Sequence, residues 1–183
     1  LLGGYARLLR APSFVLYVAI LSLTSACFYT FLGGAPMVLA AYGVRPERIG
    51  LYVMCPPVAY VFGNLLTQRL LRQGRSDAFL MQLGQATTLA GILIVLGFGL
   101  AGVHTPLTLA LPLLLMGIGN GLLLPPALTG TVGLVPALAG SAAAVAGLMQ
   151  QLVGAIGGFV VGLVPTQGPV WLALLMLLFS SLA

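Results

Sequence analysis

Charged residues are scarce in this sequence and are absent beyond Asp77. Among 183 residues there are seven Arg, two acidic residues and no Lys. A water-soluble domain cannot cover its surface with this composition, because charged side chains normally make up about a quarter of a globular chain. A bilayer favours such a composition, since a charge at the centre of a spanning helix costs roughly 2.5–3.5 kcal/mol or more. The sequence therefore predicts an integral membrane protein.

Groups that could carry out catalysis or bind a metal are equally few. The single histidine, His104, is expected in a short loop, and no apolar run contains Asp or Glu. Cys27 and Cys55 lie within apolar segments and are expected to be buried free thiols. Hydrolysis within a membrane needs a nucleophile with a base, paired aspartates or metal ligands, and Ser141 has no histidine partner at its depth. We therefore expect neither an enzyme nor a cofactor or metal site.

Long apolar runs are the most abundant feature of the chain. Hydrophobic residues make up 60% of it, and the mean hydropathy is +1.15. A spanning helix needs about 20 residues. Five runs reach that length, and the sixth would extend only ~22 Å at the rise of an α-helix. The runs cover residues 13–41, 49–71, 78–102, 107–133, 138–165 and 169–183. Because the chain starts without Met and ends within an apolar run, we expect it to be a piece of a longer protein.

The arginines predict how these spans are oriented. Arginine on short cytoplasmic loops orients a membrane protein, and five of the seven lie on one side if the N-terminal tail is cytoplasmic. This inner set comprises Arg7, Arg10, Arg69, Arg72 and Arg75, whereas Arg45 and Arg48 lie on the outer side. The positive charge therefore reflects topology, and no nucleic-acid partner is expected.

Proline and glycine interrupt the first, second, fourth and fifth runs. Examples are Pro36, Pro56-Pro57 and Pro125-Pro126, while the third run has no proline. Proline removes an intrahelical donor and bends a helix, and glycine permits close helix crossings. Helices that bend are typical of transporters rather than of inert anchors.

Four segments, in this order, resemble major facilitator drug exporters and more narrowly the Bcr/CflA multidrug efflux group. They are the stretch from Cys27 to Pro36 (CFYTFLGGAP), Gly63-Asn64 with the following Arg69–Arg72, Met116–Gly121 running to Pro125, and Gly140–Ala142 leading to Gln150. The resemblance covers the whole chain. It implies an all-α membrane fold in which six transmembrane helices form the C-terminal half of a twelve-helix major facilitator transporter. One departure is a cytoplasmic loop pattern starting at Gly63, where Thr67 replaces the expected Asp and Leu70 the expected Gly.

The resemblance also implies a function. A transporter of this kind would export amphiphilic drugs across a bacterial inner membrane by alternating access, with the proton as coupling ion. Its partners would be the drug, the lipid bilayer and an N-terminal six-helix half that also holds the coupling residue. The alternatives are a major facilitator exporter of a sugar or another metabolite, and a six-span membrane subunit that does not transport.

Candidate cavity residues come from two sets. An aromatic and hydroxyl stripe along the first run contains Phe14, Tyr17, Leu21, Thr24 or Ser25, Phe28, Leu32 and Ala35. Such a stripe either packs against neighbouring helices or lines a cavity for aromatic ligands. The amides Asn64, Asn120, Gln150 and Gln151 either bond neighbouring helices or face the pore. We expect Tyr17, Phe28, Tyr29, Asn120 and Gln150 near the cavity, and we assign no role to Gln82 or Gln85. We expect the first and fourth spans to line the cavity, the second and fifth to meet the other half, and the third and sixth to face lipid.

Overall fold

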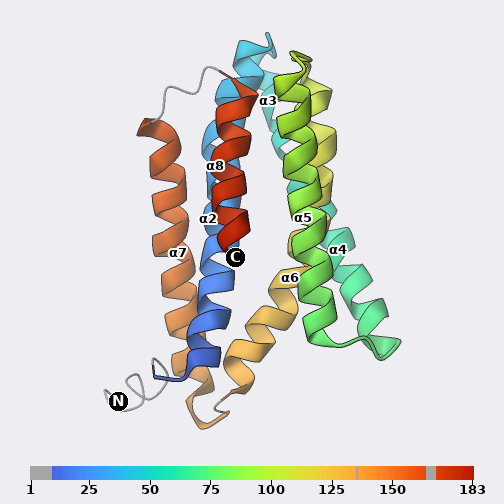
Figure 1. The fold of residues 1–183 in the computed structure, drawn as a ribbon. Helices are drawn as coiled ribbons and strands as arrows, with labels where there is room; N and C mark the ends of the chain where they lie inside the picture. The colour runs from blue at the N-terminus through green and yellow to red at the C-terminus, as the bar shows by residue number, and fades with distance from the viewer. Residues whose placement is uncertain (1–9, 135, 164–167) are drawn as a thin grey trace.

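The described part of the chain is entirely helical. A computed structural model describes residues 10–134, 136–163 and 168–183. The α-helices are α2 (Pro12–Ala41), α3 (Pro46–Val53), α4 (Cys55–Arg72), α5 (Asp77–Leu100), α6 (Pro106–Gly133), α7 (Ala139–Leu163) and α8 (Pro169–Leu182), with a short 3-10 helix at Pro136–Leu138 (Figure 1). Arg7 and the end of the predicted fifth run, residues 164–165, lie outside the described residues.

Five helical segments are long and apolar enough to cross a membrane. They are α2, α3 and α4 taken together, α5, α6, and the segment Pro136–Leu163. Helix α8, with 14 residues, is shorter but also apolar. The chain is thus a multi-pass membrane protein of all-α fold.

The predicted second run is divided into two helices at Met54. Met54 still donates its N–H to Gly50, but Pro56 and Pro57 follow directly and have no N–H to continue the ladder. The sequence marked these prolines as an interruption, and the structure shows where it falls. The break separates α3, at the end of the bundle, from the longer α4.

Local sequence signals begin and end most helices. Proline occupies the start of α2, α3, α6 and α8, where the missing N–H removes no intrahelical bond. Thr105 and Thr108 form a reciprocal cap at the start of α6. The turns after α2, α4 and α5 each contain a glycine with positive φ, namely Gly43, Gly74 and Gly102.

Helix α6 occupies the centre of the bundle. It is the most buried of the long helices, whereas α4 and the segment containing α7 are the least buried. It starts beside α5 and α4 and crosses to the end of the bundle where α2 and α7 begin (Figure 1). One apolar core joins α2, α5, α6 and α8, and a second joins α2, α6 and α7.

Glycines bring the backbones of α4, α5 and α6 into contact. A Cβ added at Gly63 would lie 2.9 Å from the Cα atom of Gly121 and even closer to the Ile118 carbonyl. Gly84 and Gly119 meet in the same way between α5 and α6. Small residues let membrane helices approach to this distance, so these glycines fix α4 and α5 against α6.

Candidate functional site

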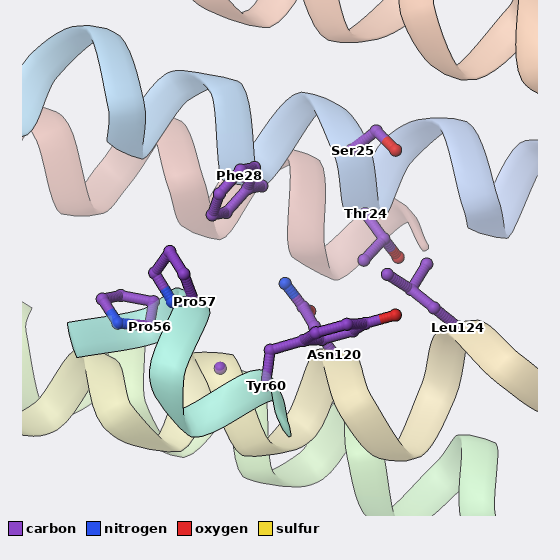
Figure 2. A pocket seen from close by; sticks show the side chains of 9 residues that line it. Thr24, Ser25, Phe28, Pro56, Pro57, Tyr60, Asn120 and Leu124 are labelled. Carbon is purple, nitrogen blue, oxygen red and sulfur yellow. The ribbon is translucent and has the colours of Figure 1, made fainter. Parts of the chain in front are cut away.

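A cavity of about 240 Å³ lies between α2, α4 and α6. It is lined by Thr24, Ser25 and Phe28 from α2, by Pro56, Pro57 and Tyr60 from α4, and by Gly117, Asn120 and Leu124 from α6 (Figure 2). No charged side chain is among its lining residues. Three helices therefore supply a mainly apolar space with a few polar groups, as is usual for small-molecule sites.

Helix α2 presents Thr24, Ser25 and Phe28 to the cavity because Phe28 lies four residues after Thr24 and three after Ser25, spacings that place side chains on one face of a helix. The Ser25 hydroxyl donates to the Leu21 carbonyl at 2.9 Å and is thereby satisfied. The Thr24 hydroxyl is buried and has no hydrogen-bond partner within the described residues. Thr24 thus lines the cavity with a buried, unpaired hydroxyl, and the hydroxyl of Ser22, which borders a different hollow, is buried and unpaired in the same way.

Helix α6 contributes one amide, that of Asn120. The side chain is only 6% exposed, and its Oδ1 accepts a long bond of 3.5 Å from the Thr88 hydroxyl. The amide nitrogen points toward the space between Phe28 and Tyr60 (Figure 2). Gly117, one turn earlier, lacks a side chain and packs directly on Pro56 and Ala59. Asn120 therefore offers N–H donors to a molecule in the cavity.

Helix α4 closes the opposite side. Pro56 and Pro57 follow the break at Met54, and Tyr60, one turn further, shares their face. The Tyr60 ring lies across the cavity floor in Figure 2, opposite Phe28. Two aromatic rings from different helices thus face one apolar space, which suits the flat face of an aromatic ligand.

The chemistry of this cavity is binding rather than reaction. Thr24, Asn120 and Tyr60 can orient a ligand by hydrogen bonds, while Phe28 and the prolines supply apolar contact. Across the described ranges, no group of three His, Cys, Asp or Glu side chains could hold a metal. A volume of 240 Å³ is below the ~300–1,000 Å³ of whole-ligand pockets, so this cavity accommodates a ring-sized part of a drug-sized molecule.

Two of the five candidate residues meet in this cavity, and three lie elsewhere. Phe28 and Asn120 line it together. Tyr17 packs on Gly130 and lines a separate surface hollow with Gln82 and Gln85. Tyr29 packs on Gly154 of α7 and donates its hydroxyl to the Gln151 side chain at 3.0 Å. Gln150 lies half-buried on α7 and is not a lining residue of the cavity.

Tyr60, Pro56, Pro57 and Leu124 were not predicted as cavity residues. The sequence did contain a signal for the α4 group, because Tyr60 follows Pro56 by four residues and so shares its helix face. The second span was expected to meet another half of the protein. In the structure it also forms one wall of the cavity.

Other polar residues form packing contacts between helices. Thr67, which replaces the expected Asp of the loop pattern, is buried and donates to the Gly121 carbonyl at 2.8 Å. Gln85 donates to the backbone and side-chain oxygens of Ser180, joining α5 to α8. Cys27 and Cys55 are free thiols, Cys27 being buried and Cys55 half-buried. These contacts stabilise the bundle away from the cavity.

Glu47 lies between Arg45 and Arg48 at the start of α3, and all three side chains are exposed. Among the described residues, no ion pair joins Glu47 to either arginine. His104 is also exposed, and its ring stacks on Tyr42 with centroids 5.6 Å apart.

Comparison with known proteins finds a likeness to a protein that carries the name of a transporter. No protein-family model matches the sequence. Over 172 residues, or 91% of this chain, it is 31% identical to a Bacillus subtilis (strain 168) protein named "Uncharacterized transporter YycB". The chain spans about 41% of the length of that relative. The relative carries the name of a transporter, which agrees with the expectation that this chain is no enzyme.

Proposed function

We propose that this chain is the C-terminal six-helix half of a major facilitator transporter that exports amphiphilic drugs in exchange for protons. Its location would be a bacterial inner membrane, with the N-terminal tail in the cytoplasm. The cavity between α2, α4 and α6 would hold part of the drug, and rocking of two halves would open it alternately to either side.

The cavity is the observation that carries this proposal. Its rings and prolines come from three helices, and Thr24 and Asn120 retain hydrogen-bonding groups that the protein does not fully use. Ser22 on the same helix is also buried without a hydrogen-bond partner and does not line the cavity, so the unpaired Thr24 hydroxyl supports the proposal only together with the rings, the prolines and the Asn120 amide. The likeness to a named transporter supports the same reading.

The exposed faces of α4 and α7 support a partner half. Both helices carry large exposed apolar side chains, among them Val61, Phe62 and Leu65 on α4 and Leu152, Ile156 and Phe159 on α7. In the proposed assembly these faces are shared between lipid and the second six-helix half. This arrangement matches the expected roles of the second and fifth spans.

Proton coupling would depend on a residue of the other half. Among the described residues, the acidic side chains are Glu47, in α3, and Asp77, at the start of α5, and both are exposed at helix beginnings. Neither lines the cavity. The proposal therefore assigns substrate contact, but not proton binding, to this chain.

Replacement of Phe28 tests the proposed drug site. Phe28→Ala removes one of two rings that face the cavity, so we expect efflux of a fluorescent aromatic cation to fall several-fold at unchanged membrane abundance. Phe98→Ala is the matched control, because Phe98 is exposed on α5 and does not line the cavity. Efflux would be measured in energised cells that carry each variant together with a matching N-terminal six-helix half, with and without an uncoupler. Equal losses for both variants, or no loss for Phe28→Ala, would contradict the assignment.

A further inference from the structure

A second pocket, separate from the drug cavity, lies at the end of the bundle where α2 ends and α3 and α6 begin. Its volume is about 340 Å³, and its walls include Tyr42, Arg45, Arg48, Tyr52 and Pro106. It shares no lining residue with the cavity between α2, α4 and α6. This end of the bundle lies at the top of Figure 1, beside α3.

Two arginines give this pocket its charge. Arg45 and Arg48 both line it, and among the described residues neither guanidinium has a hydrogen-bond or ion-pair partner. Glu47 lies between them in sequence but is not paired with either. A guanidinium carries five N–H donors in a planar fork that matches the oxygens of phosphate and carboxylate groups. Ten such donors are therefore available at one end of the protein.

The helices around the pocket add to its positive potential. Arg45 is the N-cap of α3, and Pro106 is the first residue of α6, so two helices begin at this pocket. The N-terminal end of a helix carries a partial positive charge that attracts anions. Tyr42 forms part of the wall, and its ring is stacked on His104 at an interplanar angle of 13°. Burial of Tyr42 raises the pKa of its phenol, so the hydroxyl stays protonated and adds no negative charge.

We propose that this pocket binds an oxyanion, a phosphate or carboxylate group, between Arg45 and Arg48. The group belongs either to a lipid headgroup at the membrane surface or to a soluble molecule. The pocket lies at the end of a spanning helix, where a bilayer places its headgroups and where soluble molecules also have access. The proposal does not depend on drug export or on which side of the membrane this end faces.

Binding is tested with the purified protein in neutral detergent. Unfolding is followed in a Cys55→Ala background, which removes the half-buried second thiol, with a maleimide dye that reacts as buried Cys27 becomes accessible. One arm titrates short-chain phosphatidylglycerol against diacylglycerol of the same chain length, which lacks the phosphate. The other arm titrates glycerol 3-phosphate and inorganic phosphate against glycerol. The pocket predicts a rise in Tm with at least one of the anionic probes and no rise with its neutral counterpart, which lacks the phosphate.

Variants decide whether the rise comes from this pocket. The double variant R45Q/R48Q should weaken the apparent affinity about tenfold or more, because each guanidinium makes charge-assisted hydrogen bonds. The matched control R69Q/R72Q removes two exposed arginines at the other end of α4 and should leave the affinity unchanged. A rise with phosphatidylglycerol alone assigns a lipid site, and a rise with the soluble phosphates assigns a solute site. The proposal is overturned if no anion raises Tm, or if both double variants lose the response equally.

Discussion

At the residue scale, two threonines of α2 differ in their hydrogen bonding. The Thr24 hydroxyl is buried without a partner among the described residues, as is that of Ser22. The Thr30 hydroxyl, six residues further along the same helix than Thr24, donates to the Gly157 carbonyl at 3.3 Å. In the proposed drug site, the Thr24 hydroxyl would bond the ligand.

Replacing each threonine by valine should therefore have opposite consequences. Thr24→Val removes an unsatisfied polar group, so we expect unchanged or higher Tm in detergent together with weaker drug binding. Thr30→Val removes a buried hydrogen bond and should lower the free energy of unfolding by about 1 kcal/mol. Thermal unfolding and drug binding would be measured on both variants. A marked loss of stability in Thr24→Val would show that its hydroxyl has a structural partner.

Glycine contacts make a second prediction for single residues. Gly63→Ala places a methyl group against the backbone of α6, which cannot move without displacing α4 or α5, so we expect a loss of roughly 1–3 kcal/mol in unfolding free energy. Gly97→Ala is the control, because nothing lies within 4 Å of the added Cβ. The Tm values of both variants in detergent would be compared with wild type. Equal Tm values for the two would argue against backbone contact between α4 and α6.

The sequence predicted part of the cavity, and helix geometry explains the rest. Phe28 and Asn120 were both expected and meet there, because each lies on an inward face of its helix. Tyr29 was expected with Phe28, but successive residues of an α-helix point about 100° apart. It therefore faces α7 while Phe28 faces α4. The rotation of a helix against its neighbours is fixed by packing, which a single sequence does not encode in a readable form.

At the scale of the elements, apolar runs indicated where the helices are but not how they break. The third and fourth runs, 78–102 and 107–133, correspond to α5 and α6. The second run contains the break at Met54. The position of this break depends on which carbonyls of the preceding turn lack a hydrogen-bond donor because Pro56 and Pro57 have no N–H. The sequence also did not show which helix is the most buried, because all of the spans are largely apolar. The central place of α6 depends on glycines at contacts with both α4 and α5.

The proline break gives a prediction for α3 and α4. Pro57→Ala supplies an N–H that can donate to the Val53 carbonyl and restore one of the two backbone bonds that Pro56 and Pro57 remove near Met54. We expect slower amide hydrogen exchange in the segment around residues 52–58, measured by mass spectrometry. Pro46→Ala is the control, since Pro46 begins α3 where no intrahelical bond is lost, and exchange in the same segment should be unchanged. Faster exchange in Pro57→Ala would contradict this explanation of the break.

At the scale of the whole molecule, the arginines of the described residues are separated to two ends. Arg45 and Arg48 lie where α2 ends and α3 begins, and Arg69 and Arg72 lie in the last turn of α4. Arg10 precedes α2, at the same end of the bundle as the last turn of α4 (Figure 1). The span between the two groups is long enough to cross a membrane. This separation agrees with the proposed topology, in which the end with Arg10, Arg69 and Arg72 is cytoplasmic and the oxyanion pocket would lie at the opposite end.

The last prediction concerns the two proposed halves, of which this chain would contact the substrate and the other would bind the proton. Proton-driven export needs a titratable group for which substrate and proton compete, and within a membrane such groups are usually Asp, Glu or His. The described spans carry Glu47 and Asp77 only at helix beginnings, and His104 lies between α5 and α6. We therefore expect residues 1–183 expressed alone to give no uncoupler-sensitive efflux of a fluorescent cation, and co-expression with a matching N-terminal six-helix half to restore it. Cells carrying either half, both or neither would be compared at equal membrane abundance. Robust uncoupler-sensitive efflux from this chain alone would require a proton site built from residues assigned here to packing, and would refute the proposal.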